Sequence, residues 1–211
     1  MARVEPAQRN SGTREVIFEA AERLFAERGF ADTSVRDIVG EAETSAPSLY
    51  HFFGSKENLV VELIADRHEA YCEELEGELA SAKTAFEVCQ RFVKFVLTSM
   101  STKPVTAKFL LGIMFGPQQD LPEKAVGETL ARSPEILQAR MSEVTEGVSA
   151  SRLVFARMML VGMVTPAVLM FLTAGIRTFS PKLPGCIAHR VVDMLNDSHP
   201  ICAWPDLGPR P

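Results

Sequence analysis

The sixteen residues from Thr44 to Leu59, TSAPSLYHFFGSKENL, constrain the fold of this chain more than any other segment. Ser45 precedes a short helical stretch that has Pro47 in its first turn. Gly54 ends that stretch, and Ser55 begins the next helix. An isolated helix shorter than about 12–15 residues is marginal in water. We therefore expect other parts of the chain to hold this helix, and its outer face to stay free for a partner.

The residues before this segment predict a first helix with one apolar face. Ile17 and Phe25 lie on that face, and the acidic Glu22 is expected on the opposite, polar side. Gly29 supplies a left-handed stop, and Phe30 is placed to fold back on the helix.

A second helix follows and is joined to the short third helix by a tight turn. It begins at Ser34, with Asp37 three residues on as in a capping box. The turn contains Glu43, and Leu49 and Phe53 of the third helix are expected to point inward because they are four residues apart. This arrangement predicts a helix-turn-helix.

The rest of the chain predicts more helices and no strand-like alternation. A fourth helix runs for about twenty-four residues from Ser55, long enough to leave the first domain and enter a second. Further helices are predicted over residues 85–100, 104–115, 136–146, 152–176 and 185–196. The expected fold class is all-α. The expected division is a disordered arm at 1–12, a helix-turn-helix domain at 13–58, a helical domain at 59–196 and a loosely ordered Pro-rich tail at 197–211.

The chain is acidic, with a formal net charge of −5. Residues 1–60 alone hold seven Lys/Arg against ten Asp/Glu. A non-specific nucleic-acid coat needs a global basic field, so the composition disfavours that class. A sequence-specific DNA reader needs only a local patch, and the composition allows it.

The short third helix is the candidate for DNA contact. In a helix-turn-helix the later helix enters the major groove with its N-terminal residues facing base edges, and small side chains allow close approach. Helix N-termini offer free N–H groups to phosphates, and we expect Tyr50, His51 and Lys56 to add side-chain phosphate contacts. The predicted DNA-binding residues are Ser34, Arg36, Thr44, Ser45, Ala46, Pro47, Ser48, Tyr50, His51 and Lys56.

Residues 13–63 resemble the DNA-binding module of the TetR family of transcriptional regulators. The resemblance rests on AAERLFAERGFADTSVRDIV followed by SxxSLYHFFGSKENL, and it covers about a quarter of the chain. It implies a homodimer on a pseudo-palindromic double-stranded DNA operator and a helical C-terminal effector-binding and dimerisation domain. The expected function is a homodimeric repressor released from DNA by a small, largely apolar effector. An activator of the same family and a regulator without an effector remain open.

Two residues of the helix-turn-helix are unfavourable for DNA binding. The family usually has Gly in the turn where this chain has Glu43, and a non-Gly residue at positive φ costs about 1 kcal/mol. The carboxylate also weakens DNA binding if it faces the phosphates. Pro47 offers no donor to a base, so we expect few base hydrogen bonds.

The C-terminal half is rich in Met and Phe, which suit an adaptable apolar cavity and equally an ordinary core. His68 and Cys72 lie four residues apart on one helix face, but no further ligands complete a metal site, so no metal is expected. A hydrogen-bonded core histidine is the simpler interpretation. The predicted effector-binding residues are His68, Cys72, Phe92, Phe95, Phe109, Ile113 and Met159.

Residues 158–176 carry no charged side chain and approach the length of a membrane span. Gly162 and Pro166 dilute the apolar run, so we expect a buried or interface helix, with a membrane-anchored helical protein as the alternative from another class. The resemblance places the dimer interface in the last two long helices. The predicted interface residues are Met158, Gly162, Val168, Phe171, Val191 and Met194.

Neither an enzyme nor a cofactor is expected. The sequence has no HExxH, GxSxG, P-loop or GxGxxG motif, and its four His are scattered. Its four Cys lack CxxC spacing, and no secretory signal opens the chain. These features favour a reduced cytoplasmic, nucleoid-associated protein with no membrane partner.

Overall fold

The computed structural model describes residues 6–115, 127, 129–176 and 178–196 of the chain. No strand occurs in this part, so the predicted all-α fold is confirmed. The helices are α1 (Pro6–Arg28), α2 (Val35–Glu41), α3 (Ala46–Phe53), α4 (Lys56–Leu79), α5 (Ala85–Thr102), α6 (Pro104–Phe115), α8 (Arg132–Glu143), α9 (Ala150–Ala174) and α10 (Leu183–Asn196).

Serine side chains cap the three helices that follow α1. The Ser34 hydroxyl accepts from the Asp37 N–H, and the Asp37 carboxylate accepts from the Ser34 N–H at 2.9 Å, so the predicted capping box is confirmed. These hydrogen bonds from Ser34 hold the pKa of the Asp37 carboxyl below its usual value. Ser45 and Ser55 cap α3 and α4 in the same way, each accepting from a backbone N–H three residues on. The caps satisfy N–H groups that a helix start leaves unpaired, which explains why these helices begin where the sequence predicts.

The apolar faces of α1, α3 and the first half of α4 meet in an N-terminal core. Phe18 and Leu49 are fully buried there, and the rings of Phe18 and Phe53 stack with centroids 5.1 Å apart. Helix α6 closes this core with Phe109, Leu110 and Ile113. The predicted boundary between residues 58 and 59 therefore cuts through α4, and the packing does not follow it.

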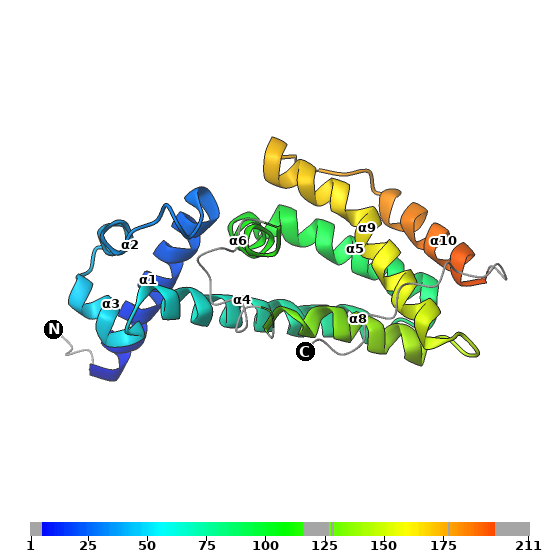
Figure 1. Cartoon of the computed structure of the whole chain (residues 1–211), viewed down its shortest axis with the longest axis horizontal. Coiled ribbons are helices and arrows are strands. Elements are labelled where there is room, and N and C mark those ends of the chain that lie inside the picture. Colours follow the sequence, from blue (N-terminus) through cyan, green and yellow to red (C-terminus); the bar gives the residue numbers. More distant parts are fainter. Residues whose placement is uncertain (1–5, 116–126, 128, 177, 197–211) are drawn as a thin grey trace, which may run out of the picture.

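The second core lies among the far half of α4 and helices α5, α8, α9 and α10. Leu75, Val93, Leu160 and Val191 are fully buried in it. Figure 1 shows α4 running from the helix-turn-helix into the second domain, with α8 along its far half and α5, α9 and α10 above these two helices. Helix α4 is thus shared by both cores, and its 24 residues agree with the predicted length.

Two predicted helix boundaries were wrong. Helix α1 begins at Pro6, so residues 6–12 are helical and not a disordered arm. Proline is tolerated at a first helical position because its missing N–H has no partner there. Helix α8 begins at Arg132, ahead of the predicted residue 136, because Pro134 lies in its first turn and does not break it. Residues 1–5 and the predicted tail at 197–211 lie outside the described residues.

Candidate DNA-binding surface and effector cavity

The turn between α2 and α3 is closed by backbone hydrogen bonds around a left-handed Glu43. The Thr44 N–H donates to the Val39 carbonyl at 2.9 Å, and the Glu43 N–H donates to the Gly40 carbonyl at 3.4 Å. This is the Schellman pattern, which places its left-handed residue at Glu43 with φ of 48°. The predicted positive φ is confirmed, and the residue at that position carries a Cβ that glycine would lack.

Helix α3 has one buried face and one exposed face. Leu49 and Phe53 are 0% and 4% exposed, which confirms that they anchor the helix inward. Tyr50 is 51% exposed, and Pro47 and His51 are also on the outer side. The helix therefore presents the outer face that insertion into a groove requires.

The predicted DNA-binding residues divide by exposure and by their existing partners. Ser34, Arg36, Ser45, Pro47, Tyr50 and His51 are exposed, whereas Thr44, Ala46, Ser48 and Lys56 are half-buried. The hydroxyl groups of Ser45 and Ser48 lie 2.9 Å apart in a hydrogen bond. Contact of these residues with DNA stays a prediction.

The Lys56 side chain has hydrogen-bond partners within the domain, and its contact with phosphate stays a prediction. The Lys56 ammonium donates to the carbonyls of Phe30 at 3.0 Å and Thr33 at 2.9 Å, and it lies 4.1 Å from the centroid of the Phe30 ring. These contacts hold the loop between α1 and α2 against the start of α4. The amino group is therefore a structural tie within the domain, because unpaired loop carbonyls recruit it.

A cavity of about 620 Å³ lies between α4, α5, α6, α8 and α9 and reaches α1. Its volume falls in the roughly 300–1,000 Å³ range of small-molecule sites. Leu111, Met114 and Val164 are among its apolar wall residues. Two arginines fasten α8 to α4 and hold that wall: Arg132 pairs with Glu69 and with Glu76 at 3.1 Å, and Arg140 donates to the Ala80 carbonyl at 2.9 Å.

Two of the predicted effector-binding residues, His68 and Phe92, line this cavity. The remaining five, Cys72, Phe95, Phe109, Ile113 and Met159, do not line it, and their prediction as cavity residues was wrong. Phe109 and Ile113 are only 1% and 6% exposed because they complete the N-terminal core, where Phe109 lies 6.2 Å from the ring of Phe25. Met159 is 37% exposed.

The side chains of Phe95 and Cys72 pack against other residues and do not line the cavity. The ring of Phe95 packs 5.0 Å from that of Tyr71, and Cys72 is fully buried. Burial raises the pKa of the Cys72 thiol to about 11, so it stays protonated and unreactive. Among the described residues no group of three or more His, Cys, Asp or Glu is arranged to hold a metal ion.

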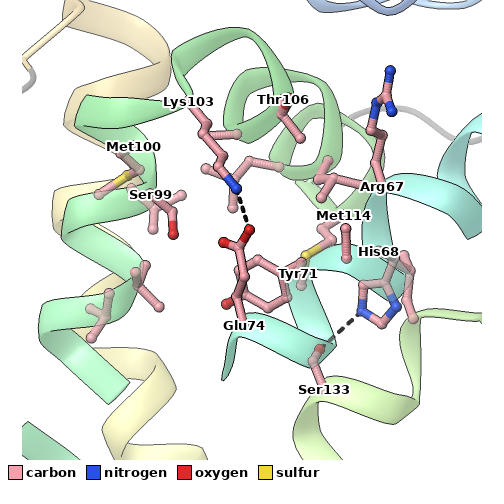
Figure 2. Close-up of a pocket in the computed structure, with 18 of the residues that line it drawn as sticks. Arg67, His68, Tyr71, Glu74, Ser99, Met100, Lys103, Thr106, Met114 and Ser133 are labelled. Atoms are coloured by element: carbon pink, nitrogen blue, oxygen red, sulfur yellow. Dashed lines mark hydrogen bonds and ion pairs between the residues drawn. The ribbon is translucent and has the colours of Figure 1, made fainter. Parts of the chain in front are cut away.

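His68 is the polar residue of the cavity wall that the sequence identified. Its Nε2 lies 3.2 Å from the Ser133 hydroxyl of α8, and Figure 2 shows this link at the edge of the cavity. Its Nδ1 lies 3.6 Å from the Cys72 sulfur. Burial, together with the charge of Arg132, lowers the pKa of His68, so the ring is neutral at pH 7.

The sequence did not single out the other polar residues of the wall. Figure 2 shows Lys103 paired with Glu74 across the cavity, with Tyr71 and Arg67 on the same side of α4. Burial raises the pKa of the Tyr71 hydroxyl. Arg67, Tyr71 and Glu74 are spaced three or four residues apart, which is the signal that they share one face of α4.

Glu22 was predicted on the polar side of α1, and that prediction was wrong. The residue is 7% exposed, and it lines the cavity. Its carboxylate accepts from Arg67 Nε at 3.1 Å, so a helix far along the chain covers it. Glu22 lies four residues after the buried Phe18 and three before the buried Phe25, and this spacing is the signal that it shares their face of α1.

The predicted dimer residues fall into two groups. Met158 and Gly162 are exposed on α9, and Met194 of α10 is half-buried. Val168, Phe171 and Val191 are 4%, 5% and 0% exposed because they pack inside their own protomer, so their prediction as interface residues was wrong.

Helix α9 is long and apolar enough to cross a membrane by length and composition alone. In this structure its inner face packs into the second core with Leu153, Ala156, Leu160 and Val164. Its other face exposes Val154, Met158, Val161, Leu169 and Met170, each between 38% and 46%. A helix with one face in a core and one bare apolar face fits the predicted interface helix.

Comparison with known proteins shows which family the helix-turn-helix resembles. The family model for the bacterial regulatory proteins of the tetR family matches residues 17–63. The repressor KstR2 of Rhodococcus jostii is 48% identical over 54 residues, which are 26% of each chain. The probable regulator YttP of Bacillus subtilis is 32% identical over 72 residues, 34% of this chain and 35% of that one. The chain thus spans about a quarter to a third of the length of these curated relatives.

Solved structures extend the similarity over both domains. A TetR family regulator from Marinobacter aquaeolei superposes with a TM-score of 0.71 and 17% identity, covering 89% of this chain and 97% of that one. FadR of Bacillus subtilis, in complex with stearoyl-CoA, gives 0.67 and 19%, covering 86% and 96%. At these identities the similarity concerns the fold.

Residues 17–63 belong to the tetR family of bacterial regulatory proteins. The prediction from the sequence motif is therefore confirmed, and α1 to α3 with the start of α4 are a TetR-type DNA-binding domain. TetR-family proteins are regulators and not enzymes, which agrees with the predicted absence of catalysis.

Proposed function

We propose that this TetR-family protein is a homodimeric transcriptional repressor that a small, largely apolar effector releases from its operator. The observation that carries the proposal is the position of the cavity against α4. The far half of α4 lines the cavity with His68, Tyr71 and Glu74, and the near half lies in the core of the DNA-binding domain with Leu59 and Leu63. A ligand that shifts α4 therefore has a direct route to the reading helix.

The repressor assignment is supported by the curated relatives, since KstR2 is named a repressor. The FadR structure was solved with stearoyl-CoA, which supports a ligand with much apolar surface in a fold of this kind. As a DNA-bound regulator, the protein acts in the cytoplasm at the nucleoid.

Selection of DNA fragments by the purified protein tests the DNA-binding part. We expect enrichment of one pseudo-palindromic sequence with half-sites about one helical turn, roughly 34 Å, apart. A bound pool without any enriched sequence would contradict an operator-specific regulator.

A matched pair of substitutions on α6 tests the effector part. Ala107 lines the cavity, whereas Val105, two residues earlier, is 41% exposed and does not. We expect Ala107→Phe to abolish the fluorescence gain of the apolar dye anilinonaphthalene sulfonate while operator affinity is retained, and Val105→Phe to behave as wild type. If Ala107→Phe bound the dye as wild type does, the cavity would not be the effector site.

The exposed apolar face of α9 is the proposed dimer contact. Leu169 is 46% exposed, and replacing it with arginine places a charge on that face near the end of α9. We expect Leu169→Arg to sediment as a monomer at micromolar concentration and to lose operator binding. Val105→Arg on α6 is the control and should remain a dimer. A dimeric Leu169→Arg protein would place the interface elsewhere.

A further inference from the structure

One residue of the cavity wall has a buried carboxylate oxygen without a hydrogen-bond partner in the described part of the chain. Glu22 is 7% exposed and lines the cavity, and its Oε2 accepts from Arg67 Nε at 3.1 Å. Its Oε1 is buried, and it has no hydrogen-bond partner in the described part of the chain. A buried acceptor left unpaired is costly, and more so when the group carries charge.

Arg67 does not supply the missing hydrogen bond, because its other nitrogens are engaged. Its Nη1 donates to Asp66 at 2.8 Å, and its Nη2 donates to Glu15 at 3.4 Å. One guanidinium is thus shared by three carboxylates, and Glu19, one turn before Glu22, also lines the cavity. This end of the cavity therefore carries an excess of negative charge.

The other charged groups of the wall have partners. Lys103 is paired with Glu74, and Arg157 of α9 donates to the Gln138 side chain at 3.2 Å. Between these groups the wall is apolar, with Leu110, Leu111 and Met114 from α6. A ligand that fills this space meets apolar surface along most of its length and an electron-rich oxygen at the α1 end.

We infer that Glu22 receives a hydrogen-bond donor of the effector. The effector is then a largely apolar molecule with a hydroxyl or a protonated amine at the end that reaches α1, and not a carboxylate there. This inference rests on the proposed effector function. Because Glu22 belongs to α1, such a ligand contacts the DNA-binding domain directly, in addition to the wall formed by α4.

Three probes of equal chain length test the inference on the wild-type full-length protein. Decylammonium, 1-decanol and decanoate share the apolar tail and differ only in the head group, and their affinities are measured by calorimetric titration at pH 7.5. We expect decylammonium and 1-decanol to bind at least about tenfold more tightly than decanoate, since a hydrogen bond to a charged partner is the difference. Decanoate binding equally or more tightly, for instance through Arg157, would overturn the inference, as would the absence of binding by all three.

Two substitutions on one helix then locate the effect. Glu22→Gln removes the charge at nearly constant shape and should weaken decylammonium binding about tenfold or more. Glu27→Gln, at an exposed position near the end of the same helix that does not line the cavity, should change it less than about twofold. Circular dichroism checks that both variants fold, and the probe ranking on the wild-type chain needs no variant. Equal losses in the two variants, or no loss in Glu22→Gln, would overturn the role of Glu22.

This failure is distinguishable from failure of the proposed function. If one operator is enriched but the three probes bind equally, the proposed regulator function stands and only the role of Glu22 is refuted. If the probes rank as expected but no DNA sequence is enriched, the ligand site stands and the proposed operator binding is refuted.

Discussion

The two domains of this protein solve the packing problem differently. In the DNA-binding domain, α1 and the serine-capped helices α2, α3 and α4 close on a filled core around Phe18, Leu49 and Phe53. In the C-terminal domain, the helices leave a cavity of about 620 Å³ with polar residues in its wall. Filled interiors resist deformation, whereas helices around an empty space lack contact partners on one side. The comparison indicates a rigid DNA-binding domain that α4 connects to a domain whose shape a ligand can change.

The largest expected effect contrasts one leucine in each domain. Leu49 is fully buried in the filled core, and Leu49→Ala should lower the free energy of unfolding by about 3 kcal/mol. Leu111 is half-buried at the cavity, and Leu111→Ala should cost about 1 kcal/mol because its removal extends space that is already empty. Urea unfolding of both variants measures the difference. Equal costs would break the contrast between a filled and a hollow domain.

The next effect concerns Lys56. Lys56→Met removes two charge-assisted hydrogen bonds to the carbonyls of Phe30 and Thr33, and it should cost about 2 kcal/mol of stability. The exposed Lys94 on α5 is the control, and Lys94→Met should stay within about 0.5 kcal/mol. If Lys56→Met left stability unchanged and weakened DNA binding, the result would favour the phosphate contact that the sequence predicts.

A smaller effect separates strain from charge at the turn. Glu43→Gly removes both the positive-φ strain and the carboxylate, and it should raise stability by about 1 kcal/mol. Glu43→Ala removes only the charge and should leave stability near that of wild type. Thermal melts and operator titrations of both variants distinguish the two. If alanine stabilised the protein as much as glycine, the strain at this position would not matter.

The smallest effect is the pH dependence of the C-terminal domain. The pKa of His68 is lowered in the folded protein from its usual value of 6.5, so the unfolded chain takes up the proton first as the pH falls. Its contribution to stability is therefore complete above about pH 6.5 and is lost below it. His68→Gln should flatten the decline in melting temperature between about pH 7 and 5.5. His51→Gln, at an exposed position on α3, should leave the decline unchanged, and the opposite pattern would refute the assignment.

The DNA-binding domain was predictable because its signals act over short distances in the chain. Ser34 with Asp37, Ser45 with Pro47, and Gly29 act on backbone groups within a few residues, and the structure places them as predicted. The cavity residues were not predictable in the same way. Phe92 and Phe109 are both phenylalanines on apolar helix faces, and only the packing of α6 against α1 sends Phe109 into the other core. Periodicity shows which face of a helix is apolar and does not show what covers that face.

By itself the sequence determined the all-α class, the capped helix-turn-helix, the left-handed turn at Glu43 and the family, because caps, turns and the motif are local. The tertiary structure alone decided that Lys56 ties down a loop, that Glu22 is buried against Arg67 and that a cavity opens beside His68. Each of these three features joins residues more than twenty positions apart in the chain. Their physical cause is the packing of whole helices, which no short stretch of sequence encodes.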